Sequence, residues 1–261
     1  KLAISLGTWY TSVSIEESAS LTKKQIHGLT IHRNRESKVL ELTDFHLENV
    51  QARDRSSRVL SAVGCGFASV FSCNANKAET TVGYSTLYGD HGGFLAPLAD
   101  LWKEKVYALG RWFQESYGLD IPEGIFTIVP SAELSAKQDV DQDEGDPFQY
   151  EYHDKLFQSW VEKWNRATPT SILEHYLAGT LAEYLDLPHQ LDHYFSSPQA
   201  FLEDLERWWR CFKGMGVVKR VQAPPIIAIT KRSFGFDYRE SILPVVFSQK
   251  YLRLKKELLG K

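Results

Sequence analysis

The chain has 261 residues, 43% of them apolar and 24% charged, which suits one large folded domain or a domain with an appendage. Its formal charge of −3 gives no electrostatic basis for binding nucleic acid, and no run of about 18 apolar residues predicts a membrane span. Three widely spaced cysteines argue against a disulfide framework and favour a cytoplasmic protein.

The first third of the chain predicts alternating strands and helices. Alternation of apolar and polar residues over 1–16 is typical of a strand, and residues 43–64 predict a helix with a polar capping residue at its start. The apolar run 67–72 is short and bounded by turn residues, as expected of a buried parallel strand. Ligands of open α/β sheets bind beyond the carboxyl ends of such strands, so the polar segment 74–93 is a candidate binding loop.

The rest of the chain is mostly helical by pattern. Residues 97–118 carry apolar side chains at helical spacing and predict an amphipathic helix that ends at Gly118. Two or three short helices are expected within 152–185, another at 198–213, and an extended tail over 222–240.

An acidic segment interrupts this pattern. Residues 138–149 hold five carboxylates and no basic residue, which most often indicates disorder, although a lid over a site is an alternative. We expect one domain, with an α/β part over 1–150 and a mainly helical part over 151–261.

Several polar residues could bind a ligand, although each also has an ordinary structural explanation. Asn49 and Arg53 stand four residues apart, so they share a helical face and could reach a polar ligand or simply face solvent. Glu79 and Asp90 could hold a divalent cation or be loop charges in water. Lys103 could contact a phosphate or lie along the apolar surface of its helix.

Three further features are weaker. Ser131 could cap a helix or place its hydroxyl near a metal or phosphate. Lys231 and Arg232 form a basic pair that could clamp an anion, although such pairs are usually surface charge. We expect no zinc site among the eight histidines.

Six sequence segments, taken together in their order along the chain, are more specific for a protein family than any one segment alone. They are ENVQARDR (48–55), NKAETTVGYSTLYGDHGG (76–93), PLADLWKEKVYALGRW (97–112), IPEGIFTIVPSAEL (121–134), QDVDQDEGDP (138–147) and TKRSFGFD (230–237). In this order and at this spacing they resemble the synthetase domain of the NAD synthetase family, most closely its glutamine-dependent bacterial type. The resemblance covers about residues 43–240.

The resemblance implies a fold and a reaction. The fold is a Rossmann-like ATP pyrophosphatase (adenine-nucleotide α-hydrolase) sheet, incomplete at its N-terminus, with a helical C-terminal region. In the reaction, the carboxylate of deamido-NAD (nicotinic acid adenine dinucleotide) attacks the α-phosphate of ATP, pyrophosphate leaves, and ammonia converts the adenylated intermediate to NAD and AMP. Mg²⁺ accompanies ATP, ammonia derives from glutamine on a separate glutaminase domain, and the family forms homodimers.

The resemblance also assigns roles to residues, none of them a nucleophile. Residues implied in deamido-NAD binding are Asn49, Arg53, Glu79, Thr86, Asp90 and Lys231. Residues implied in ATP binding are Asn74, Lys103 and Ser131, and those implied as Mg²⁺ ligands are Glu79 and Ser131. The acidic segment 137–147 corresponds to a loop that orders over the nucleotides.

One family motif is missing. The glycine-rich Ser-Gly-Gly-x-Asp-Ser loop, whose backbone holds the departing pyrophosphate, does not occur in the sequence. We therefore expect the chain to be the C-terminal part of a longer protein and to be inactive alone, which turnover of deamido-NAD, ATP and ammonia would contradict. The alternatives are an ATP pyrophosphatase that adenylates a different acceptor and a homologue that has lost catalysis.

Overall fold

The computed structural model describes residues 1–132, 134, 145–234 and 245–260, which form two compact units. Unit 1 comprises Lys1–Cys73, Thr86–Leu95 and Tyr107–Pro147, and unit 2 comprises Asn74–Ser85, Ala96–Val106 and Phe148–Lys261. Both units are therefore discontinuous in sequence. The division expected at residue 150 stays a prediction.

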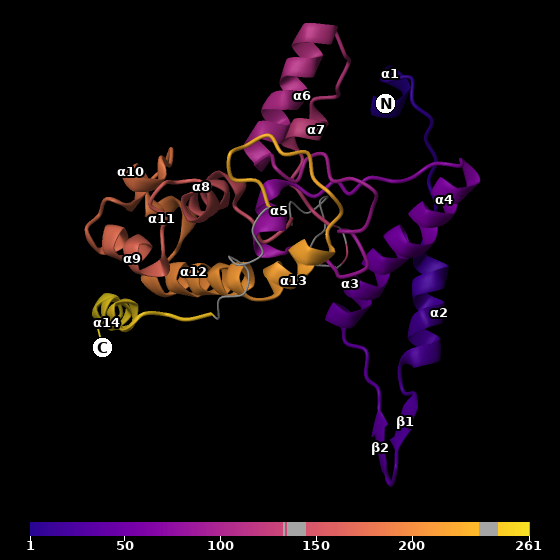
Figure 1. Cartoon of the computed structure of the whole chain (residues 1–261), viewed down its shortest axis with the longest axis horizontal. Coiled ribbons are helices and arrows are strands. Elements are labelled where there is room, and N and C mark those ends of the chain that lie inside the picture. The colour runs from indigo at the N-terminus through magenta and orange to yellow at the C-terminus, as the bar shows by residue number, and fades with distance from the viewer. Residues whose placement is uncertain (133, 135–144, 235–244, 261) are drawn as a thin grey trace. The chain divides into compact units, whose positions relative to one another are not determined.

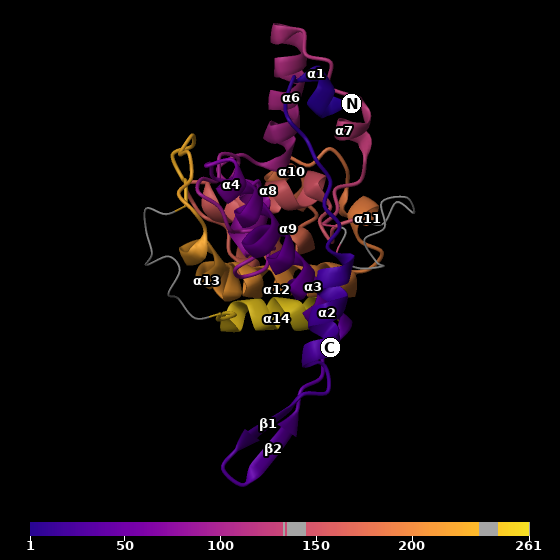
Figure 2. The ribbon, with the colours of Figure 1, turned by 90° about the vertical axis from the view of Figure 1, so that its right-hand side faces the viewer.

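Unit 1 consists of helices with one small sheet. Its elements are α1 (Leu2–Ser5), α2 (Glu16–Ile26), β1 (Thr30–Arg33), β2 (Glu36–Val39), α3 (Asp44–Arg53), the π-helix η1 (Asp54–Leu60), α4 (Ser61–Gly66), α7 (Gly124–Thr127) and most of α6 (Lys103–Tyr117). Helices α2 and α3 lie side by side, and the antiparallel hairpin of β1 and β2 extends beyond their ends (Figures 1 and 2). Strand register pairs Thr30 with Val39 and Arg33 with Glu36.

The helix expected over 43–64 is confirmed as the continuous run of α3, η1 and α4. It begins with a capping box, in which the Thr43 side chain accepts a hydrogen bond from the His46 backbone N–H and the His46 ring accepts one from the Thr43 backbone N–H. These reciprocal bonds satisfy donors that a helix start otherwise leaves unpaired. Its middle is a π-helix, which sequence spacing does not reveal.

Two expected strands of unit 1 are wrong. Residues 1–16 hold α1 and the start of α2 instead of a strand. The run 67–72 is not a strand either, and its Phe67 and Val70 are 69% and 63% exposed. The backbone turns at Ala68, where φ is 49°, and Ser69 N–H bonds back to the carbonyl of Gly64, so the run cannot extend.

The amphipathic helix expected over 97–118 is confirmed in its greater part by α6. Gly118 ends it with φ of +64°, a conformation that glycine adopts without steric cost. Residues 97–102 precede the helix in turns and bends. Within unit 1, the rings of Trp112, Phe113 and Tyr117 pack on one another but stay partly exposed.

Unit 2 is a helical assembly. Its helices are α5 (Lys77–Val82), α8 (Tyr150–Val161), α9 (Pro169–Leu177), α10 (Leu181–Leu185), α11 (Leu191–Tyr194), α12 (Pro198–Lys213), α13 (Met215–Gln222) and α14 (Gln249–Leu258). The short helices expected within 152–185 are confirmed, and the helix expected over 198–213 is α12. Pro198 occupies its first turn, and the side chain of Ser197 accepts a hydrogen bond from Ala200 N–H.

An aromatic core joins these helices. The ring of Phe148 stacks on Trp208 of α12 at 4.8 Å, and Phe157 of α8 packs edge-on against both. Helix α14 packs on α9, and Tyr251 of α14 donates a hydrogen bond to the carboxylate of Glu206 in α12. Among the described residues, no helix is long and apolar enough to cross a membrane.

Helices α5 and α13 of unit 2 touch through two glycines. A Cβ added at Gly83 would lie 2.5 Å from the Cα of Gly216, which is closer than any real side chain allows. The ammonium of Lys219 then donates to the carbonyls of Gly83 and Ser85, and Arg220 donates to that of Thr81. These cations stabilise the carbonyl end of α5, where the helix dipole is negative.

Candidate functional site

In unit 1, four of the residues implied in deamido-NAD binding lie together around the end of α3. The Thr86 hydroxyl donates to Asn49 Oδ1 over 3.0 Å, and Thr86 N–H donates to Asp90 Oδ1 over 2.6 Å. Arg53 donates from Nε to the Leu87 carbonyl over 3.0 Å. The helical spacing of Asn49 and Arg53 therefore aims both side chains at the loop 86–95.

This loop is held close to the helix by its backbone. Tyr88 has a positive φ of 62°, and a Cβ at Gly89 would lie 3.2 Å from the Ala52 carbonyl carbon. A Cβ at this distance would need its neighbours to shift by a few tenths of an ångström, so glycine favours the close approach of the loop to α3. Thr86 is buried and Asp90 is exposed, so the carboxylate lies at the surface, held by the backbone N–H of Thr86, while the buried hydroxyl bonds to Asn49.

Ser131 also belongs to unit 1, in a segment fixed through the backbone. Ala132 N–H donates to Asp146 Oδ1 over 3.0 Å, Asp146 N–H donates to the Pro130 carbonyl over 2.7 Å, and Arg55 donates to the Ala132 carbonyl over 2.8 Å. Ser131 itself is half-buried and is not the cap of a helix. Most of the acidic segment 137–147 lies outside the described residues, so its expected role over the nucleotides stays a prediction.

In unit 2, Glu79 and Lys103 meet at Tyr150. Glu79 is the third residue of α5 and accepts Asn76 N–H at 2.9 Å as part of a capping box, and its other oxygen accepts the Tyr150 hydroxyl at 3.1 Å. The Lys103 ammonium lies 5.3 Å from the centre of the Tyr150 ring. Glu79 thus has a structural task at the start of α5, and Tyr150 is a neighbour that the sequence did not indicate.

A buried ion pair fixes the segment that carries Lys231. Lys77 is fully buried, and its ammonium lies 2.7 Å from Asp100, 2.6 Å from Glu162 and 2.8 Å from the Thr230 hydroxyl. Asp100 also accepts the backbone N–H groups of Ile229 and Thr230. Burial alone would raise the pKa of Asp100, but these donors together hold it below its usual value. Lys231 is the residue after Thr230, and it is exposed.

The sequence-predicted residues therefore fall into two groups. Unit 1 brings together Asn49, Arg53, Thr86 and Asp90 and holds Ser131 in another segment. Unit 2 holds Glu79, Lys103, Lys231 and the exposed Asn74. The sequence did not indicate Lys77 and Asp100, since a lysine in a polar run gives no sign of burial.

The chain is similar to one family of known proteins over most of its length. A model of the NAD synthase family matches residues 1–186. The chain belongs to the NAD synthase family. It is 32% identical over 206 residues to a glutamine-dependent NAD(+) synthetase of Aquifex aeolicus, covering 78% of this chain and 31% of that one. It is 33% identical over 196 residues to a protein of the same name from Xylella fastidiosa, covering 75% and 30%.

A solved structure shows the same fold. The glutamine-dependent NAD(+) synthetase of Cytophaga hutchinsonii aligns with 98% of this chain and 37% of its own, with a TM-score of 0.65 and 19% identity. The expected α/β fold class of the NAD synthases is thereby confirmed, although the described residues are rich in helix and hold one small sheet. This family member spans about a third of the length of the relatives that it matches.

Proposed function

We propose that the chain serves the ATP-dependent amidation of deamido-NAD to NAD, through an adenylated intermediate and with ammonia from glutamine. Family membership supports the reaction class. The observation that carries the proposal for this chain is the cluster of Asn49, Arg53, Thr86 and Asp90, since four residues implied in binding one substrate meet within a single unit. A homodimer and a cytoplasmic location are part of the proposal.

In unit 1, the proposed task is to hold deamido-NAD. A guanidinium has five N–H donors, and the described hydrogen bonds of Arg53 use two of them, to the carbonyls of Leu87 and Asn49. Those two bonds fix the plane of the guanidinium, so its remaining donors are oriented before an anionic substrate arrives. Asn49 and Asp90 add an amide and a carboxylate that can select hydroxyl or amide groups of the ligand.

In unit 2, the proposed task is to neutralise phosphate charge. Lys103 would bind the ATP phosphates as a point charge, held beside Tyr150. Lys231, which follows a segment anchored by Lys77 and Asp100, would bind an anionic group of deamido-NAD. Glu79 in unit 2 offers a carboxylate and Ser131 in unit 1 a hydroxyl, and each is an oxygen ligand suited to Mg²⁺. The ion would supply charge neutralisation on the phosphates.

Isothermal titration of the chain with deamido-NAD, without ATP, tests the proposal. Arg53→Ala should weaken binding by about tenfold or more, because it removes charge-assisted bonds to an anion. Arg33→Ala is the matched control, since Arg33 is an exposed arginine of the same unit in strand β1. Equal binding by Arg53→Ala and Arg33→Ala would remove the unit 1 cluster as the site.

A second titration, with ATP, separates the alternatives. A homologue without catalysis, which the missing Ser-Gly-Gly loop favours, should bind neither deamido-NAD nor ATP. An enzyme for a different acceptor should bind ATP but not deamido-NAD.

A further inference from the structure

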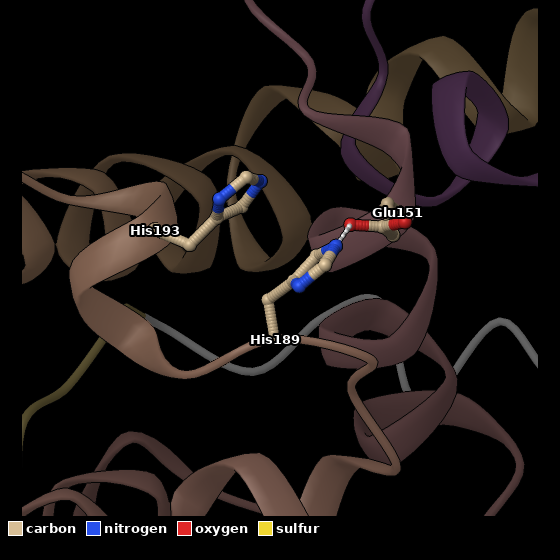
Figure 3. A group of neighbouring side chains, drawn as sticks. All are labelled: Glu151, His189 and His193. Atoms are coloured by element: carbon tan, nitrogen blue, oxygen red, sulfur yellow. Dashed lines mark ion pairs between the residues drawn. The ribbon is translucent and has the colours of Figure 1, made fainter.

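Three side chains that the proposed function does not use meet at the surface of unit 2. Glu151 lies in the first turn of α8, His189 precedes α11, and His193 lies within α11. One ligand atom from each lies within 4.8 Å of the others (Figure 3). His189 Nε2 is 4.0 Å from Glu151 Oε2, and the two imidazole rings are 4.3 Å apart between centroids.

The sequence contains a sign of this group. His189 and His193 stand four residues apart in His-Gln-Leu-Asp-His, a spacing that places two imidazoles near each other when the chain turns. The expectation of no zinc site overlooked this pair. The carboxylate comes from Glu151, far earlier in the chain, so no local sequence pattern indicates it.

A buried tyrosine organises the two segments. Tyr194, which is 8% exposed, donates from its hydroxyl to Glu151 Oε2 over 2.7 Å. Its backbone carbonyl accepts a hydrogen bond from the Gln149 side chain over 3.1 Å. A donor that orients a ligating carboxylate is the usual outer support of a metal site.

We propose that Glu151, His189 and His193 bind a Zn²⁺ ion. Imidazole nitrogen and carboxylate oxygen are zinc ligands, with bonds of about 2.0 to 2.2 Å, so ligand atoms of a tetrahedral site lie roughly 3.4 Å apart. Their present separations, up to 4.8 Å, close to that value by small rotations of exposed side chains. Water completes the coordination. Two imidazoles set this site apart from the oxygen ligands that Mg²⁺ prefers.

Zinc at this position would join α11 to the start of α8. Because the ion binds the folded arrangement and not the unfolded chain, it should stabilise unit 2 in proportion to its concentration. Binding requires neutral imidazoles, so zinc affinity should fall as the solution is made acidic.

Titration of the untagged chain with Zn²⁺, followed by calorimetry and by thermal melting, tests the proposal. We expect one ion per chain and a rise in melting temperature. His189→Ala and His193→Ala should each weaken binding at least tenfold, and Tyr194→Phe should weaken it less while keeping the ring packed. The matched control is His32→Ala, an exposed histidine of strand β1 in unit 1.

Circular dichroism of each variant shows whether the fold is kept. Zinc binding by His189→Ala and His193→Ala that equals that of His32→Ala would overturn the proposal. Absence of zinc binding by the parent chain would overturn it as well, as would tighter binding of Mg²⁺ than of Zn²⁺.

Discussion

The two units of this chain hold their functional residues by different means. Unit 2 contains all of the largest fully buried side chains of the described residues, among them Trp160, Trp208 and Phe157. In unit 1 the buried apolar residues of the described part are Ala52 and Cys73, while large side chains such as Phe67 are exposed. Unit 2 thus combines apolar burial with the buried ion pair of Lys77 and Asp100, whereas in unit 1 hydrogen bonds position Asn49, Arg53 and Thr86.

The test of this contrast with the largest expected effect compares two phenylalanines. Phe157→Ala in unit 2 should lower the free energy of unfolding by about 3 to 5 kcal/mol, because it leaves a cavity among fully buried rings. Phe67→Ala in unit 1 should change it by less than about 0.5 kcal/mol, since that ring is 69% exposed. Urea unfolding followed by tryptophan fluorescence measures both. Equal losses would mean that unit 1 has a core of its own.

A second test compares two ion pairs. Lys77→Ala should cost about 3 kcal/mol, because it leaves the buried carboxylate of Asp100 without its cation. Arg58→Ala in unit 1 removes a pair with Asp54 whose arginine is 51% exposed, and should cost far less, because solvent screens an exposed pair. The same unfolding assay applies. A Lys77→Ala chain as stable as Arg58→Ala would show that water reaches Asp100.

The smallest test concerns pH. Burial raises the pKa of Asp154 in unit 2 from its usual 3.8 to about 7, because the hydrogen bond from Glu104 N–H replaces only part of the lost water. The folded pKa exceeds the unfolded one, so the stability that Asp154 contributes is complete below about pH 4 and is lost as pH rises through 7. Asp154→Asn should therefore stabilise the chain at pH 8 by roughly 2 kcal/mol, and little at pH 4.

Asp54 of unit 1 is the matched control and should behave in the opposite way. The Arg58 guanidinium holds the pKa of Asp54 below its usual value, with help from Ser18. The stability that ionised Asp54 contributes is present above its unfolded pKa and is lost as pH falls through the folded pKa. Asp54→Asn should therefore destabilise the chain at pH 8, by less than about 1 kcal/mol. Unfolding curves at pH 4 and pH 8 separate the two. Destabilisation by Asp154→Asn at pH 8 would contradict the assigned pKa shift.

Prediction from sequence succeeded where local signals suffice. The helix expected over 198–213 is α12, and the four-residue spacing of Asn49 and Arg53 placed both on one helical face. The roles of Thr86 and Asp90 were expected only from the resemblance to a family. In the structure, Thr86 bonds to both Asn49 and Asp90.

Prediction from sequence failed where tertiary packing determines the conformation of a segment or the burial of a side chain. An apolar run such as 67–72 looks the same whether it pairs as a strand or turns back on a helix, and only Ala68 and Ser69 show which occurs here. Likewise, Lys77 reads as a loop charge until Asp100 and Glu162, far along the chain, are found beside it.

The contact between Gly83 and Gly216 has an evolutionary consequence. A Cβ at Gly83 would meet the backbone of Gly216, and a Cβ at Gly216 would meet the backbone of Cys211 in α12 and of Val82 in α5, so a replacement at one glycine cannot be compensated by a smaller residue at the other. Substitutions at these two positions should not be tolerated, whereas exposed residues of α13, for example Val218 and Val221, can vary. When distant relatives are compared, this glycine pair should therefore persist longer than the helices' own sequences, and its loss should mark lineages in which α13 has moved away from α5.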